Sequence, residues 1–191
     1  MTAPKKLTLR NKIGYGFGHV MNDLTASVWV TYLLVFLVQV VKLEKTLAGI
    51  VILVGQASDG ISTIFIGYFS GFKYNLWLCN KVGNKLAWHV IGSVFLGLSH
   101  PFLFKPVFDY ANISDQTAVF LYFCFFTTTT DFGWSIVENA HLAIIPDLTS
   151  SQNDKTGLVA IRYVLLMICF KFLKSRSTYN LIYNLQRRIL F

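Results

Sequence analysis

Residues 47–69 form an almost wholly apolar stretch that carries a single charge, Asp59, near its middle. About 20 consecutive apolar residues match the hydrocarbon thickness of a bilayer. A carboxylate at that depth costs on the order of 2.5–3.5 kcal/mol, so it is expected to face protein or water and to serve a function. Small and polar residues that would let a second helix approach recur along the stretch: Gly55, Gln56, Ser62, Thr63 and Gly67. The stretch therefore predicts a membrane-spanning helix with an ion- or substrate-coupling acid at its centre.

The composition excludes an ordinary soluble domain. Hydrophobic residues make up 54% of the 191 residues and charged residues 14%, and the mean hydropathy is +0.53. The net charge of +8 comes from basic residues in loops and tails, where they set membrane orientation rather than bind nucleic acid. The three cysteines, Cys79, Cys124 and Cys169, have an odd count and no metal-ligand spacing, so neither a metal site nor a disulfide framework is expected.

Hydropathy divides the chain into a basic arm (1–13), a membrane bundle (14–170) and a basic tail (171–191). Four spans are expected in the bundle, over residues 15–41, 47–69, 86–104 and 117–145. A fifth apolar run, 157–170, is short for a span, and we expect it to be incomplete. The tail mixes basic and apolar residues, which predicts an interfacial helix along the membrane surface.

The first span carries polar residues at helical spacing. His19, Asp23, Ser27 and Thr31 are each four residues apart, so they share one face of a helix. Two interpretations of Asp23 stay open: a functional acid inside the membrane, or an acid that is simply solvated near the membrane edge.

The fourth span carries two acids. Asp131 and Glu138 are seven residues apart and share a helical face with Thr127 and Ser135. Glu138 either belongs to that polar face or reaches the cytoplasmic interface. Pro146 is expected to close the span.

Basic residues predict the orientation of the bundle. The arm and the loop 71–85 are richer in Lys and Arg than the loops on the opposite side, which carry Lys42, Lys45 and Lys105. The positive-inside rule places the N-terminus in the cytoplasm, and a four-span topology puts both ends there. The sequon at Asn112 then lies in a lumenal or extracellular loop and is a candidate glycosylation site.

Five strings in fixed order resemble a known family. They are GHVMNDL (18–24), GQASDGIST (55–63), FGW (132–134), HLAIIPDL (141–148) and AIRY (160–163). Over about residues 9–164 the chain is similar to the major facilitator superfamily, in its glycoside-pentoside-hexuronide:cation symporter branch. The resemblance implies a twelve-helix transporter of two six-helix halves with alternating access. This chain would be an all-α membrane protein that forms a truncated N-terminal half of such a bundle, with four to five transmembrane helices.

The resemblance also implies roles for single residues. Substrate would be bound by Asp23, Asn22, Arg162 and Trp134. Cation coupling would fall to Asp59, Asp131 and Glu138, with H+ or Na+ as the cation and no other cofactor. The solute would be small and polar, and cysteine import into lysosomes or related organelles is suggested by the resemblance alone. The protein would then be a multi-pass protein of lysosomal or other endomembranes, or alternatively of the plasma membrane.

The sequence departs from the family in the loop after the second span and beyond about Leu166. That loop lacks the usual acid, and its basic cluster is reduced to Lys81, Asn84 and Lys85, so the family's charge latch is not expected. Because seven helices of the family would be missing, two interpretations stay open. The chain is a solute:cation symporter, or it is a non-transporting membrane protein that associates or competes with a second half-bundle or a full-length relative. An enzyme is not expected, since no nucleophile–base set is evident.

Overall fold

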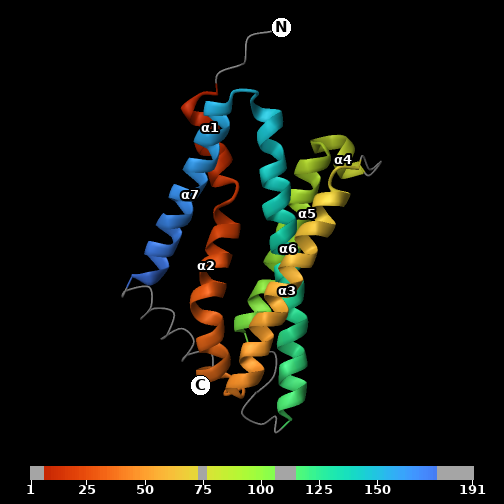
Figure 1. Ribbon diagram of the computed structural model, residues 1–191, viewed down its shortest axis with the longest axis vertical. Coiled ribbons are helices and arrows are strands. Elements are labelled where there is room, and N and C mark those ends of the chain that lie inside the picture. Colours follow the sequence, from red (N-terminus) through yellow and green to blue (C-terminus); the bar gives the residue numbers. More distant parts are fainter. Residues whose placement is uncertain (1–6, 73–76, 106–114, 176–191) are drawn as a thin grey trace. The chain divides into compact units, whose positions relative to one another are not determined.

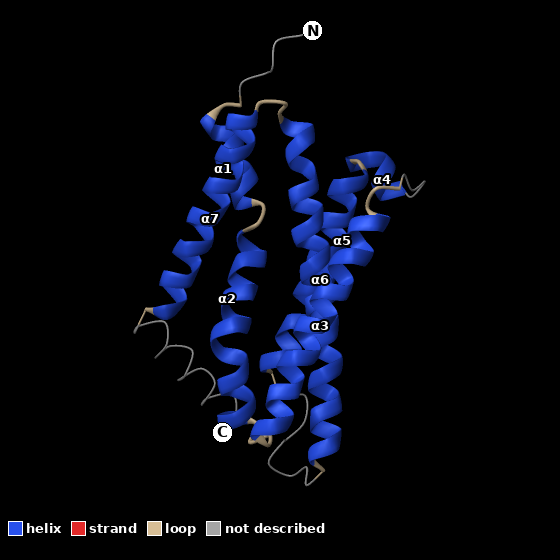
Figure 2. Cartoon of the chain, viewed as in Figure 1, coloured by secondary structure: helices blue, strands red, loops and turns tan. Residues whose placement is uncertain are grey.

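A computed structural model describes residues 7–72, 77–105 and 115–175, and these are helical with short connections and no strand (Figures 1 and 2). The all-α class expected from the sequence is confirmed. The helices are α1 (Leu9–Phe17), α2 (Val20–Val35), the π-helical turn η1 (Phe36–Val40), α3 (Lys45–Phe69), α4 (Trp77–Val82), α5 (Asn84–Phe104), α6 (Gln116–Leu148) and α7 (Gln152–Lys174).

The chain forms two compact units. The first comprises residues 1–29 and 146–191, and the second comprises residues 30–145. The boundaries fall inside α2 and α6. The first unit therefore holds α1, the start of α2 and α7, and the second unit holds α3, α4, α5 and most of α6.

Four segments within the described ranges are long and apolar enough to cross a membrane: Val20–Val40, Lys45–Phe69, Asn84–Phe104 and Gln152–Leu173. The second and third of these segments end where the expected spans 47–69 and 86–104 end, and each begins two residues earlier than expected. α6 has 33 residues, but its polar residues keep it outside this set. It runs past Pro146, so the expectation that this proline closes the helix is wrong.

The expected first span, 15–41, is interrupted. α1 ends at Phe17 and α2 begins at Val20. Gly18 caps α1 and donates its backbone N–H to the Gly14 carbonyl oxygen, so the interruption is a short turn at residues 18 and 19. Gly16 has a second role, because a Cβ there would lie 2.7 Å from Leu165 Cδ1 of α7. The absence of a side chain lets α1 and α7 pack side by side in the first unit (Figure 1).

The apolar run 157–170, which was expected to be an incomplete span, lies at the centre of the longer helix α7. Ser151 caps its N-terminus, and its side chain accepts a hydrogen bond from the Asp154 backbone N–H. The capped polar turn extends the helix to 23 residues, enough to cross a bilayer. The expected interfacial helix of the tail lies mostly outside the described residues.

α3 buries one face, formed by Ala48, Val51, Gly55, Ser62 and Ile66. Of the small and polar residues singled out in the sequence, Gly55 and Ser62 therefore lie on the packed face. Gln56, Thr63 and Gly67 are exposed, so only part of this set takes part in helix packing among the described residues.

Two glycines allow α5 and α6 to approach closely in the second unit. A Cβ on Gly133 would lie 2.9 Å from the Leu96 backbone nitrogen, and one on Gly92 would lie 2.7 Å from the Ile136 side chain. This contact fixes the part of α6 that carries Asp131 and Ser135.

Candidate functional site

The centre of α3 is joined to α6 through polar contacts. Ser135 Oγ donates a hydrogen bond to Asp59 Oδ1, and it also lies 3.2 Å from the Asp59 backbone oxygen. Ser58, beside Asp59, donates a hydrogen bond of 3.3 Å to the Thr128 backbone oxygen. The acid expected at the centre of the second span thus has a partner on a neighbouring helix.

Asp131 lies one helical turn before Ser135 and is 1% exposed. Among the described residues, neither of its carboxylate oxygens has a hydrogen-bond partner, and the buried Thr127 hydroxyl one turn earlier has none either. Asp131 and Asp59 are near enough for their charges to interact. A buried carboxylate without donors is stabilised when a proton or a cation neutralises it. The two acids are therefore candidates for binding a proton or a cation.

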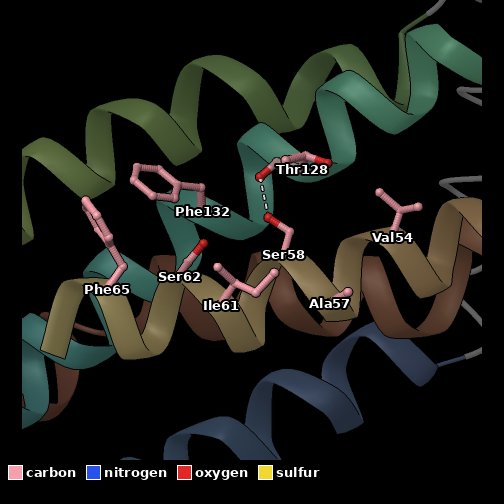
Figure 3. A pocket seen from close by; sticks show the side chains of 8 residues that line it. All are labelled: Val54, Ala57, Ser58, Ile61, Ser62, Phe65, Thr128 and Phe132. Carbon is pink, nitrogen blue, oxygen red and sulfur yellow. Dashed lines mark hydrogen bonds between the residues drawn. The ribbon is translucent and has the colours of Figure 1, made fainter.

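A cavity of about 590 Å³ opens between α3 and α6 beside these contacts (Figure 3). Its lining combines three hydroxyl residues with two phenylalanines and three aliphatic side chains: Ser58, Ser62, Thr128, Phe65, Phe132, Val54, Ala57 and Ile61. None of these side chains is charged, so the cavity suits a neutral or partly apolar group that accepts or donates a few hydrogen bonds.

The first unit holds a second polar cluster, at the start of α2. Asn22 Nδ2 lies 3.1 Å from His19 Nε2, and the same nitrogen of His19 lies 3.6 Å from Asp23 Oδ1. All three side chains are buried. Asp23 is therefore buried among protein side chains rather than simply solvated, and its depth in the membrane stays a prediction. Ser27 extends the same face, whereas Thr31 is exposed.

The remaining expected site residues are dispersed. Arg162 is buried on α7 of the first unit, with its guanidinium 5.8 Å from the centre of the Tyr163 ring. Trp134 and Glu138 are half-buried on α6. Asn112 lies outside the described residues. A common site for the acids of both units stays a prediction.

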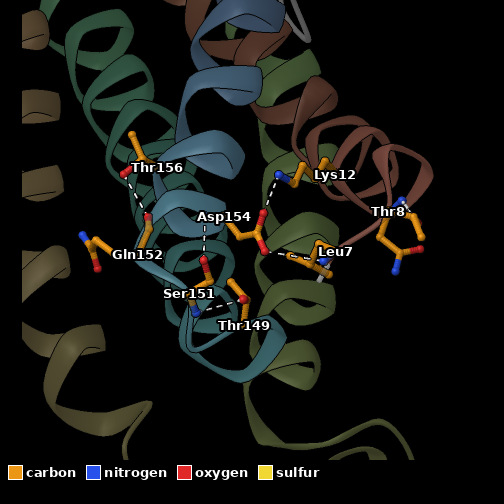
Figure 4. A network of polar contacts seen from close by, with 9 residues as sticks. Leu7, Thr8, Lys12, Thr149, Ser151, Gln152, Asp154 and Thr156 are labelled. Atoms are coloured by element: carbon orange, nitrogen blue, oxygen red, sulfur yellow. Dashed lines mark hydrogen bonds and ion pairs between the residues drawn. The ribbon is translucent and has the colours of Figure 1, made fainter. Parts of the chain in front are cut away.

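Sequence reasoning missed a polar network that joins α1 to α7 (Figure 4). Lys12 Nζ lies 2.6 Å from Asp154 Oδ1, and the Leu7 backbone N–H donates a bond of 3.5 Å to the other carboxylate oxygen. Thr149 Oγ1 accepts a 3.1 Å bond from the Ser151 backbone. The spacing Ser-x-x-Asp from Ser151 to Asp154 was the available signal for the helix start.

Comparison with known proteins identifies a matching family model and several similar proteins. A family model described as MFS/sugar transport protein matches residues 14–173. Major facilitator superfamily domain-containing protein 12 of horse is 37% identical over 166 residues, which are 87% of this chain and 34% of that protein. The human protein of the same name is 35% identical over 166 residues, again 87% of this chain and 34% of its own length. An uncharacterized symporter of Synechocystis is 28% identical over 160 residues, or 83% of this chain and 28% of that protein. The chain thus spans about one third of the length of the curated relatives it matches.

Proposed function

This chain belongs to the MFS/sugar transport protein family, and we propose that it acts as a solute:cation symporter in which Asp59 and Asp131 bind the coupling cation. The observation that carries the proposal is the unequal environment of the two acids. Asp59 accepts a hydrogen bond from Ser135, whereas Asp131 is buried with no partner among the described residues. Such an arrangement favours uptake of one proton or one Na+ by the pair.

The proposed coupling step is electrostatic. When the cation binds, the negative charge beside the cavity falls, and the Ser135 hydroxyl stays with Asp59 and keeps α3 and α6 in register. A solute bound within reach of the charge of the pair then meets less negative surroundings. The affinity for solute would change with cation occupancy, which is the thermodynamic requirement for symport.

For the solute itself we propose a small zwitterion, with cysteine as the first candidate on the resemblance of the sequence motifs. Asp23 and Asn22 would bind an ammonium group and Arg162 a carboxylate, because these pairs have complementary charge and hydrogen-bonding geometry. The same resemblance makes Trp134 a candidate solute-binding residue and Glu138 a candidate cation-coupling residue. On the same resemblance we propose that the protein works in lysosomal or other endomembranes. H+ or Na+ is the coupling cation, and no further cofactor is required.

The test is uptake of labelled cysteine by liposomes that contain the purified chain, under an imposed proton or Na+ gradient. Uptake above empty vesicles that is lost in Asp59→Asn and Asp131→Asn would support the proposal. Asp115→Asn is the matched control, because Asp115 is exposed and its contact with the Thr117 backbone N–H at the start of α6 can be made by asparagine.

The alternative function is that of a membrane protein that does not transport and instead associates or competes with a longer relative. Inserted protein that gives no flux with any gradient would overturn the symporter proposal for this chain. Recovery of a longer relative with the tagged chain, together with reduced flux by that relative, would then support the alternative.

A further inference from the structure

We propose that the corner between α3 and α5 is a binding surface for anionic phospholipid headgroups. The corner consists of the end of α3 and its turn (residues 65–72), the short helix α4 and the start of α5 (residues 83–85). The proposal does not depend on the transport function. It rests on the contact between the start of α5 and the turn after α3, on exposed aromatic rings and on the exposed ammonium group of Lys81.

A side chain of α5 joins the start of that helix to the turn after α3. Asn84 Nδ2 donates two hydrogen bonds of 2.7 Å, to the backbone oxygens of Ser70 and Phe72. Gly83 adopts a φ of +89°, which few other residues tolerate, and so turns α4 into α5. The loop that hydropathy predicted over residues 71–85 is therefore in part a structured element, and α4 packs against α5.

Large aromatic side chains of the corner are exposed. Tyr68 is 66% exposed, Phe72 46% and Trp77 74%, and the rings of Tyr68 and Phe72 lie 5.1 Å apart. The corner joins the ends of two segments that can each cross a membrane. Aromatic rings at such a level lie among the headgroups and the first methylene groups of the lipid. The corner is therefore expected to lie in the membrane interface.

The charge of the corner is positive. Lys81 is exposed, and its Nζ lies 5.1 Å from the centre of the Trp77 ring. The ring is neutral, so this contact orients the ammonium group without cancelling its charge. The sequence has no acidic residue between Asp59 and Asp109, and Lys81 forms no ion pair within the described ranges. A ligand for this surface must be an anion at the membrane boundary.

An anionic phospholipid meets both requirements, because its phosphate and headgroup charge lie at the depth of the exposed rings. An acidic segment of another protein would satisfy the charge of Lys81 but would leave Trp77 and Tyr68 without an apolar environment. The aromatic residues therefore favour the lipid. A basic residue near an anionic surface raises binding about fivefold.

The experiment measures how strongly the purified full chain retains phosphatidylglycerol over phosphatidylcholine, by native mass spectrometry from mixed micelles. We expect Lys81→Gln to lower this preference about fivefold and Lys81→Arg to keep it. Lys105→Gln is the matched control, because Lys105 is exposed at the opposite end of α5. Trp77→Leu should weaken retention of both lipids.

Three outcomes would overturn the proposal. The preference could survive Lys81→Gln, or it could fall equally in Lys105→Gln, which would show a general effect of net charge. The third is that Lys81→Gln abolishes binding of a polyglutamate peptide while lipid retention stays unchanged, in which case the surface binds acidic protein.

Discussion

Ser135 on α6 lies one helical turn after the buried acid Asp131 and donates a hydrogen bond to the Asp59 carboxylate on α3. The Ser135 hydroxyl therefore donates to Asp59, one of two neighbouring acids. The hydrogen bond gives the Asp59 carboxylate a donor, and a hydrogen bond to a charged group contributes about 1.5–3 kcal/mol. Among the described residues, the Asp131 carboxylate has no hydrogen-bond donor.

The first prediction concerns Asp131→Asn. The substitution removes a buried charge and keeps the side-chain volume, so we expect cation-coupled uptake to fall at least tenfold while the melting temperature in detergent is unchanged or higher. Uptake assays and thermal unfolding of the same sample check this. A clear loss of thermal stability would contradict the view that the Asp131 carboxylate lacks stabilising partners, and Asp115→Asn should leave both readouts unchanged.

The second prediction tests whether the hydroxyl group of Ser135, rather than the size of its side chain, matters for stability and coupling. Ser135→Ala removes the donor to Asp59 and should cost about 1–3 kcal/mol of stability, together with a several-fold change in the cation concentration for half-maximal uptake. Ser135→Thr retains a hydroxyl and should lie closer to the unaltered protein. If the alanine and threonine variants behave alike in the cation titration, the hydrogen bond has no part in coupling.

The polar face of α6 could be predicted from the sequence, but its partner could not. The spacing of Thr127, Asp131 and Ser135 follows from the helical period alone, and the structure confirms that all three are buried. The meeting of Ser135 with Asp59 depends on how α3 and α6 pack in three dimensions. No periodicity within one segment encodes such a register between segments.

The helix ends, too, could be predicted from the sequence only in part. The limits of α3 and α5 could be predicted because long apolar runs stop at polar residues. The early start of α7 depends on a serine cap, which an average of hydropathy does not detect. The signal was present in the sequence as the Ser-x-x-Asp pattern beginning at Ser151.

The third prediction tests the close approach of α5 and α6. Gly133→Ala would place a Cβ 2.9 Å from the Leu96 backbone nitrogen. Because backbone cannot move aside cheaply, we expect a loss of about 1–3 kcal/mol in the free energy of unfolding. Gly97→Ala is the control on α5, since a Cβ there meets nothing within 4 Å, and it should be neutral or stabilising by up to about 1 kcal/mol. Equal effects at the two positions would refute the packing argument.

The fourth prediction concerns the ion pair between Lys12 and Asp154, whose side chains are 21% and 13% exposed. Partial burial lowers solvent screening, so the pair should contribute more than a surface salt bridge, about 1–2 kcal/mol. A double-mutant cycle with Lys12→Ala and Asp154→Asn isolates this energy, because asparagine retains an acceptor for the Leu7 backbone N–H. The readout is thermal or denaturant unfolding in detergent.

Lys155→Ala is the matched control for that cycle, since Lys155 follows Asp154 in α7 and forms no ion pair within the described residues. Combined with Asp154→Asn it should show additive effects within about 0.5 kcal/mol. A coupling energy near zero for Lys12 and Asp154 would mean that Gly16 and its neighbours hold α1 against α7 by packing alone. A coupling energy above about 1 kcal/mol would instead show that the ion pair helps to hold α1 at the start of α7. Charge and packing would then act at separate points along the same contact.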